Sequence, residues 1–550
     1  MHVKKSTWWL LAAIMGISLF LRLFLINQMP GGLFPDEAAN GLDINLMEQG
    51  QIQPFYERGN GREAMFFYML WGSVKLFGRG PWQHHIVSAL LGVLTVLFTF
   101  FLVRKLFLTA EQHWAERADL IALLSSFFVG VSSWQVIISR TAFRANTLPL
   151  FVVLFFWSML ETYLSKNQKR RLFWSGLTGL WFGLGFYTYI AFRVMLLIVP
   201  MVLLWPILAA IFEKRYDRLK TFILPLIVFC CVTLITLIPM ASYMVRHPDQ
   251  LVGRSGQVSV FNTDLNQGKL VATTASVVKQ SVLGYFTEGD TNWRHNISGK
   301  PLISPILSPF LLIGALIITY FALVYFLGPR KYSRYWWAWF LIIWTGGMLA
   351  PVVTTAEGIP HALRSLGTVP GVFVLIAFGL VWVINFLFKT GEEGSHPVRF
   401  GTKIEHVILG ILATVLIMET SLLYFGEAYA SPAYQYAFRA DLTVVSNYLL
   451  KNGSKEHTYL ILDKFSVQTT DYLTTVNSKN PEDPRNQPYR QVDPENAYVI
   501  TNLVPGDEIV FTQSSVFDTT KFKQYHSEAY LKFQQTNRFN QTVLAVYGIK

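Results

Sequence analysis

"WWLLAAIMGISLFLRLFLI" occupies residues 8–26 and contains one charged residue, Arg22. A helix that crosses a membrane needs about 20 mostly apolar residues, because lipid cannot satisfy the backbone polar groups. The stretch follows two lysines as a signal peptide would, but it is long and no small-residue cleavage site comes after it. We therefore expect an uncleaved first membrane span, in which the Arg22 side chain reaches to the outer interface.

Comparable apolar stretches recur along the 550 residues, of which 52% are hydrophobic and 15% charged. This composition lies outside the range of soluble domains and predicts an α-helical polytopic membrane protein with about eleven transmembrane helices. Gly, Ser and Trp interrupt the stretches at 118–138 and 172–190. The expected spans are 8–26, 86–107, 118–138, 147–164, 172–190, 193–212, 221–244, 302–327, 335–355, 362–387 and 404–425.

Clusters of lysine and arginine predict the orientation, because short cytoplasmic loops are enriched in them. With these spans, the clusters HVKKS, VRKLF, KNQKRR, EKRYDRLK, GPRKYSR and KTGEEGSHPVRFGTK all fall on one side. We therefore expect a multi-pass plasma membrane protein with a cytoplasmic N-terminus and its larger polar segments outside. The net charge of +12 then reflects orientation, and no basic tail or motif indicates a nucleic-acid partner.

The chain after residue 425 changes in character. The runs TYLILD, DEIVFT and TVLAVYG are typical of short strands between amphipathic helices, whereas NSKNPEDPRNQPYRQVDPEN is typical of a loop. We expect residues 1–425 to form a transmembrane domain and residues 426–550 an extracytoplasmic α/β domain. Within the former, residues 27–85 would be a first external loop with amphipathic helices. Residues 245–301 would be a long external loop that either covers the site or only caps the helix bundle.

"GGLFPDEAANGLDINLMEQG", residues 31–50, places two adjacent carboxylates, Asp36 and Glu37, shortly after the first span. Pro35 suits the first position of a helix, and the helix dipole stabilises acids in a first turn. In such a helix Asp36 and Asp43 share one side and Leu42 lies on another, which predicts an amphipathic helix on the outer membrane surface. The pair is either a favourable helix start that faces water or part of a catalytic site.

Cationic side chains gather at the other outward-facing helix ends. These residues, which we interpret as a donor phosphate site, are Arg140, Arg144, Arg193, His361 and Arg364. A guanidinium matches the oxygens of a phosphate, although each residue alone could equally contact a lipid headgroup. Further candidates for substrate binding lie in the two external loops: Asp43, Arg58, Arg62, Glu63, Glu288, Asp290, Arg294 and His295. His295 and His361 lack the close spacing of a metal site, so we expect catalysis without a required metal ion or other cofactor.

An acid and a cationic site at a membrane interface suit the attack of an acceptor hydroxyl on a sugar carried by a lipid phosphate. Asp36 would act as general base, and the arginines would stabilise the departing phosphate. The chain shows neither a P-loop nor a convincing dinucleotide-binding fingerprint. A transporter or flippase of lipid-linked sugars is the main alternative, but it would place ionisable groups near the middle of the spans, which are nearly free of Asp and Glu. A noncatalytic scaffold or sensor that presents the external domain is a third interpretation.

Several stretches share a pattern of spacing and residue type: FPDEAANGLDI, FFYMLWGSVKLFG, ISRTAFRANTLPLF, GLGFYTYIAFRVM, GDTNWRHNISGKPLISPIL and HALRSLGTVPGVFVLIAFG. With them, over roughly residues 8–425, the chain resembles the GT-C superfamily of membrane glycosyltransferases. Within it, the chain is similar to glycosyltransferase family 39, the protein O-mannosyltransferase and aminoarabinose transferase group. The resemblance implies a polyprenyl-phosphate-linked sugar as donor, transfer on the extracytoplasmic side with inversion at the anomeric carbon, and Asp36 as base. Glu37 would position the acceptor or the acid.

One position departs from the family pattern. Where relatives often place a second acid at the start of the fourth span, this chain has Asn146. Either another carboxylate substitutes, such as Asp43, Glu63, Glu288 or Asp290, or the acceptor is bound differently. The acceptor, whether a protein hydroxyl, a lipid or a glycan, is therefore not carried over from the family.

Overall fold

The computed structural model describes residues 3–59, 61–212, 214, 216–251, 256–327, 334–388, 399–475 and 487–550. The chain forms two compact units. The first, here called the helical unit, comprises residues 1–24, 60–65 and 88–427. The second, the sheet unit, comprises residues 25–59, 66–87 and 428–550. Residues 27–85 were predicted to belong to the transmembrane domain, whereas in the structure most of them cluster with the tail of the chain.

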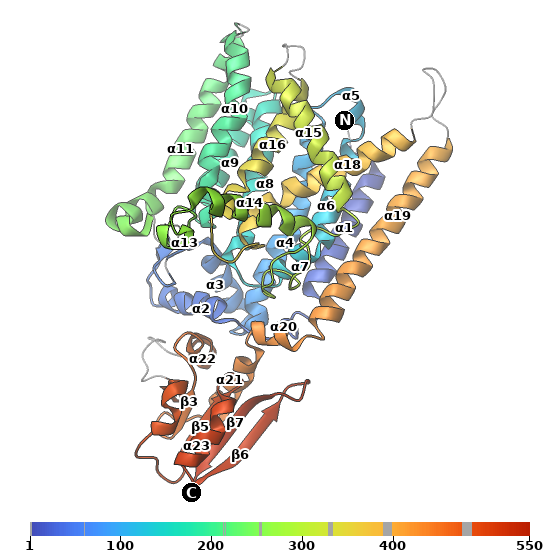
Figure 1. The fold of residues 1–550 in the computed structure, drawn as a ribbon. Coiled ribbons are helices and arrows are strands. Elements are labelled where there is room, and N and C mark those ends of the chain that lie inside the picture. Colours follow the sequence, from blue (N-terminus) through green and yellow to red (C-terminus); the bar gives the residue numbers. More distant parts are fainter. Residues whose placement is uncertain are drawn as a thin grey trace. The chain divides into compact units, whose positions relative to one another are not determined.

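The helical unit consists mainly of long helices, some of them joined by longer segments that carry short helices (Figure 1). Its long helices are α1 (Lys5–Leu23), α4 (Pro81–Phe107), α6 (Ala118–Val131), α8 (Thr147–Leu164), α9 (Gln168–Gly185), α10 (Met195–Phe212), α11 (Tyr216–Arg246), α14 (Leu270–Phe286), α15 (Ser308–Leu327), α16 (Trp336–Gly347), α18 (Val369–Leu387) and α19 (Arg399–Ser421). Its short elements are β2 (Arg62–Glu63), α5 (Gln112–Glu116), α7 (Ser133–Ser139), η1 (Arg144–Asn146), η2 (Ile190–Val194), η3 (Pro248–Leu251), α13 (Thr263–Asn266), α17 (Ala350–Val353), η5 (Arg364–Thr368) and the π-helix η6 (Leu422–Ala428).

Within the ranges that the structure describes, nine helices are long and apolar enough to cross a membrane, and the bent pair α6 and α7 would make a tenth. These positions agree with the predicted spans except at 172–190, where α9 forms a helix but starts with the charged run QKRR. α9 packs between α8 and α11, two helices of the apolar set. The prediction of a polytopic helical membrane protein is confirmed.

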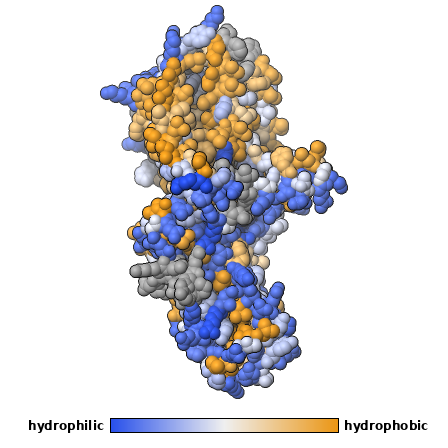
Figure 2. Space-filling view, turned by 90° about the vertical axis from the view of Figure 1, so that its left-hand side faces the viewer, coloured by the Kyte–Doolittle hydropathy of each residue, from blue (hydrophilic) through white to orange (hydrophobic). Residues whose placement is uncertain are grey.

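The surface of the helical unit is itself apolar. On the face drawn in Figure 2, hydrophobic side chains cover much of the long helices. Leu197 on α10, Leu234 on α11 and Leu316 on α15 expose 67%, 65% and 72% of their area. Water would oppose so large an apolar surface, whereas hydrocarbon chains solvate it, so this surface faces lipid.

A 59° bend separates α6 from α7 and frees backbone carbonyls from the helix ladder. Arg22 is fully buried and donates hydrogen bonds to the carbonyls of Val129 (3.3 Å) and Gly130 (2.7 Å), while the hydroxyl of Thr420 donates to the carbonyl of Val131. The expectation that Arg22 reaches the outer interface is therefore wrong. Its N–H groups satisfy carbonyls that the broken helix leaves without partners in lipid.

The sheet unit contains a mixed five-stranded sheet in the order β4-β3-β5-β7-β6. β3 pairs in parallel with β4 and β5, and β7 pairs antiparallel with β5 and β6. The strands are β3 (Thr458–Ile461), β4 (Arg490–Val492), β5 (Glu508–Thr512), β6 (Ala529–Thr536) and β7 (Thr542–Ile549). The other elements of the unit are α2 (Pro35–Glu48), β1 (Phe55–Tyr56), α3 (Met65–Phe77), α20 (Pro432–Ala437), α21 (Ala440–Asn452), α22 (Val467–Thr474), η8 (Pro494–Val499), η9 (Val516–Asp518) and α23 (Thr519–Tyr525).

Helices cover both faces of this sheet. Leu442 and Leu449 of α21 pack with Val510 on one face, and Phe522 of α23 packs with Phe511 on the other. Successive residues of β5 point to opposite faces, so its uninterrupted apolar run Ile-Val-Phe is buried on both sides. The predicted α/β domain is confirmed, and three of its strands lie where expected. β4 falls inside the segment predicted as a loop, whose residues 477–486 lie outside the described part of the chain.

Helix α2 packs against α22 of the same unit. Leu33, Ala38 and Leu42 form a cluster with the ring of Tyr472, and the hydroxyl of Thr469 donates to the carbonyl of Leu33 (3.0 Å). This contact explains why the first external segment clusters with the tail. The amphipathic pattern does predict a helix, but its polar side is covered as well as its apolar side, which differs from the surface helix expected.

The close approach of α2 and α22 requires a glycine. A Cβ added at Gly41 would lie 2.4 Å from the Tyr472 ring, which is fully buried. We expect Gly41→Ala to destabilise the sheet unit by about 1–3 kcal/mol, the usual cost of overpacking a core. Gly72→Ala in α3 is the matched control, because nothing lies within 4 Å of its added Cβ. Thermal unfolding of purified protein in detergent should show a lower melting temperature for Gly41→Ala only, and equal melting of both variants would contradict the packing argument.

Candidate active site

The first turn of α2 holds the two adjacent acids in different environments. Glu37 is fully buried, and its Oε2 accepts a hydrogen bond from the backbone N–H of Phe34 at 2.9 Å. Its Oε1 lies 3.3 Å from Nε2 of His85, which is also buried, near the start of α4. Asp36 is exposed. Glu37 therefore positions the turn, and Asp36 offers the accessible carboxylate.

Asp43, further along α2, is also buried and already has an ionic partner. Its Oδ1 accepts a hydrogen bond from Nε of Arg58 at 2.9 Å, and 24% of the Arg58 side chain is exposed. The pair ties α2 to the segment that follows it. Of the acids predicted in this stretch, only Asp36 has an exposed side chain.

In the helical unit, one buried carboxylate holds two arginines from different segments. Oε2 of Glu63 in β2 accepts a hydrogen bond from Nε of Arg144 in η1 at 3.0 Å. Nη2 of Arg193 in η2 lies 4.0 Å from Oε1 of the same carboxylate. The Arg144 guanidinium also lies over the ring of Tyr189, 5.7 Å from its centroid. The Glu63 carboxylate thus links β2, η1 and η2 through ionic contacts.

This arrangement, here called the arginine pair, sets two partly exposed guanidinium groups beside one buried carboxylate. Glu63 is 3% exposed, whereas the side chains of Arg144 and Arg193 are 18% and 33% exposed. Each guanidinium carries five N–H donors, more than its contact with Glu63 uses. Two guanidinium groups in this arrangement match the oxygens of a phosphate, and the Glu63 carboxylate holds Arg144 in place.

Other predicted residues of the helical unit lie elsewhere. Arg140 is fully buried and donates to the carbonyls of Leu21 (3.2 Å) and Arg22 (2.8 Å) and to the hydroxyl of Tyr424 (2.9 Å). The structure thus does not place Arg140 with the arginine pair. Arg62, next to Glu63, is 6% exposed.

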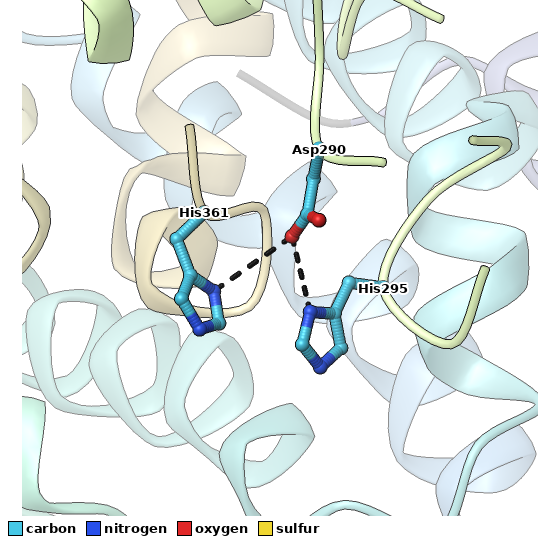
Figure 3. A group of neighbouring side chains, drawn as sticks. All are labelled: Asp290, His295 and His361. Carbon is cyan, nitrogen blue, oxygen red and sulfur yellow. Dashed lines mark hydrogen bonds and ion pairs between the residues drawn. The ribbon is translucent and has the colours of Figure 1, made fainter. Parts of the chain in front are cut away.

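A second group of predicted residues meets where the loop after α14 approaches the segment before η5. Nδ1 of His295 lies 3.0 Å from Oδ2 of Asp290, and Nδ1 of His361 lies 3.8 Å from the same oxygen. Figure 3 shows both rings turning Nδ1 toward this carboxylate. Asp290 and His295 are 5% and 8% exposed, and the side chain of His361 is 14% exposed. The three side chains, here called the Asp–His–His cluster, come together from two segments far apart in the sequence.

The charge state of the cluster follows from its contacts. Burial raises the pKa of Asp290, but the hydrogen bond from His295 and the interactions with both histidines outweigh it, so the pKa lies below its ordinary value. Burial lowers the pKa of His295, against the opposing effect of Asp290. At neutral pH the cluster therefore presents an ionised carboxylate beside a neutral imidazole.

Three further candidates lie on the same two segments. Arg294 donates its Nε to the side chain of Asn292, and Nη1 of Arg364 donates to the carbonyl of Glu357 at 2.6 Å. Glu288 is exposed. Asn146 is buried, and its Nδ2 donates to the carbonyl of Ser88 at 2.9 Å, so the position where the family pattern has an acid here holds a structural amide.

Two features of the site were not predicted from the sequence. Glu63 was expected to bind substrate, and no local spacing indicates that it holds Arg144 and Arg193, which are distant in the chain. Tyr189 was not singled out, although its place in YTYIAFR, shortly before Arg193, was the available signal. Both contacts form only when segments that are distant in the sequence pack together in the fold.

Comparison with known proteins places this geometry in a family context. Residues 63–243 match the model of the dolichyl-phosphate-mannose-protein mannosyltransferase family. This match includes the whole arginine pair and Glu63, but neither Asp36 nor the Asp–His–His cluster. No curated protein sequence matches the chain.

Solved structures are similar over nearly the whole chain. The crystal structure of ArnT from Cupriavidus metallidurans bound to undecaprenyl phosphate shares 12% identity with a TM-score of 0.54, covering 99% of this chain and 98% of that one. The chain therefore has the fold of that structure. AglB, the archaeal oligosaccharyltransferase from Archaeoglobus fulgidus solved with an inhibitory peptide and a dolichol-phosphate, shares 12% identity with a TM-score of 0.51. That match covers 98% of this chain and 74% of AglB. At the level of the fold, the resemblance drawn from the sequence motifs is confirmed.

Proposed function

We propose that the protein is a membrane glycosyltransferase that moves a sugar from a polyprenyl-phosphate-linked donor to an acceptor hydroxyl on the extracytoplasmic side. The observation that carries the proposal is the arginine pair, two guanidinium groups held by one buried carboxylate within the matched part of a GT-C chain. Two proteins of the same fold were solved with undecaprenyl phosphate and with a dolichol-phosphate, which supports a lipid phosphate as the anion.

The arginine pair would bind the phosphate that joins the sugar to the lipid. As the glycosidic bond breaks, negative charge grows on this phosphate, and preorganised guanidinium groups stabilise that charge in the transition state. Glu63 would keep Arg144 in place before the donor arrives, so little reorganisation is needed during the reaction. Because a phosphate is a weakly basic leaving group, the step needs no general acid and, in this proposal, no metal ion or other cofactor.

Asp36 would be the general base that takes the proton of the acceptor hydroxyl. Its carboxylate is exposed at the first turn of α2, and the buried Glu37 fixes that turn. Attack by the hydroxyl in a single displacement gives inversion at the anomeric carbon. The acceptor is then a protein, lipid or glycan hydroxyl that reaches this carboxylate.

The distribution of charge supports the proposed side of the membrane. The Lys and Arg clusters predict a cytoplasmic N-terminus, which puts α2 and the sheet unit outside the cytoplasm. The plasma membrane, with its lipid-linked donors and outward acceptors, is the location consistent with this orientation.

The proposal is tested with full-length protein in lipid nanodiscs and a panel of labelled polyprenyl-phosphate hexoses and pentoses. We expect release or transfer of sugar from one member of the panel, faster with a crude envelope extract as acceptor, and inverted configuration in the product. Folded protein that consumes no donor, but moves lipid-linked sugar across the bilayer of proteoliposomes, would contradict the transferase and support the flippase instead.

A further inference from the structure

We propose that Asp290, His295 and His361 bind a divalent transition-metal ion of the zinc class. The proposed transfer step does not use this ion, so the inference does not depend on the proposed function. One ligand atom from each residue, an imidazole nitrogen or a carboxylate oxygen, lies within 4.8 Å of the other two. Figure 3 shows the three side chains converging, with the carboxylate and the two Nδ1 edges directed into one space.

The distances fit a tetrahedral centre. Zinc binds imidazole nitrogen and carboxylate oxygen at about 2.0–2.2 Å, which puts neighbouring ligand atoms about 3.4 Å apart. The separations of Oδ2 of Asp290 from the two Nδ1 atoms, 3.0 and 3.8 Å, lie on either side of this value.

The backbone fixes the carboxylate before any ion binds. Oδ1 of Asp290 accepts the N–H of Asn292 (2.8 Å), and Oδ2 accepts the N–H of Ala362 (2.9 Å). The carbonyl of Asp290 accepts the N–H of Gly299 (3.0 Å), which closes the loop that carries His295. Such hydrogen bonds behind a ligand orient it and strengthen metal sites.

The ligand types select the class of ion. Two imidazoles and one carboxylate suit zinc and neighbouring transition metals, whereas calcium and magnesium prefer sites made of oxygen alone. Three protein ligands leave a fourth position for water. The ion would join the external loop of 287–301 to the segment of His361, so we expect its binding to stabilise the folded protein.

The competing interpretation is a hydrogen-bonded Asp290–His295 pair that holds no ion, since 3.0 Å also suits a hydrogen bond. The experiment that separates the two uses full-length protein in detergent, freed of any polyhistidine tag and stripped with a chelator. The protein is then equilibrated with zinc or cobalt and analysed by inorganic mass spectrometry and visible absorption. We expect one ion per chain, cobalt bands of a tetrahedral site, and a melting temperature that rises on reloading.

Substitutions in the Asp–His–His cluster test whether the ion binds there. His361→Ala and Asp290→Asn should each weaken zinc binding at least about tenfold while the protein still elutes as a folded species. His247→Ala, an exposed histidine outside the cluster, is the matched control and should bind as wild type does. No bound ion in the wild type, or equal binding by all variants, which would indicate an adventitious ion only, would overturn the proposal.

Discussion

Asp36→Asn is expected to lower kcat for sugar transfer by about 10²–10⁴-fold, the usual contribution of a positioned general base. Asparagine keeps the size of the side chain and its place in the first turn of α2, but it cannot accept the proton of the acceptor hydroxyl. The donor KM should change little, because the arginine pair and not Asp36 would bind the phosphate. The measurement is steady-state transfer from the identified donor, with wild type and variant in the same nanodiscs.

Two companion variants make this result specific. Asp264→Asn changes another exposed aspartate in the first turn of a helix and should be silent. Glu37→Gln should lower the melting temperature as well as kcat, because the buried Glu37 carboxylate contacts both the Phe34 N–H and His85. Full activity of Asp36→Asn would remove Asp36 from the mechanism.

Arg144→Ala is expected to raise the donor KM and to reduce kcat/KM by about 10²–10³-fold, the scale seen when one donor to a developing oxyanion is lost. The guanidinium would contact the phosphate both when the donor binds and as its charge grows. Arg144→Lys should restore only part of the loss, since an ammonium lacks the planar fork that matches a phosphate. Initial rates at varied donor concentration separate the two parameters.

The matched control is Arg170→Ala, because Arg170 also contacts a glutamate, Glu161, at 3.5 Å but is 62% exposed. It should leave both parameters unchanged. Glu63→Gln should raise the donor KM, since the amide holds Arg144 less firmly. An unchanged KM in both Arg144→Ala and Glu63→Gln would separate the arginine pair from donor binding.

Local patterns in the sequence predicted much of the architecture. Apolar stretches of sufficient length must be helices in lipid, so most spans were located from composition alone. The strands at 458–461, 508–512 and 542–549 were found because buried strands read as short apolar runs. β4 and β6 were missed, since Arg490–Val492 lies in a Pro- and Asn-rich segment and Ala529–Thr536 is mostly exposed and lacks a continuous apolar run.

The sequence predicted which types of residue form the candidate site, but not which of these residues contact one another. The sequence could not tell the exposed Asp36 from the buried Glu37. Both are acids in the same helix turn, and only the structure shows in which direction each side chain points. Arg140 and Arg144 read alike in the sequence, yet one donates to backbone carbonyls inside the bundle and the other contacts Glu63. The prediction that no metal ion is required was based on the spacing of histidines along the chain. That spacing does not show that His295 and His361 lie beside the same carboxylate in the fold.

The sequence by itself determined that the protein is a polytopic helical membrane protein with a small α/β unit, acids at the start of α2 and cations at helix ends. It did so because hydrophobic length, strand pattern and helix-start chemistry are local properties. Only the tertiary structure decided which charges are partners: Glu63 with two arginines, Arg22 with the carbonyls of a broken helix, and Asp290 with two histidines. Those pairings depend on how helices and loops distant in the chain pack together, and no local pattern encodes the resulting distances.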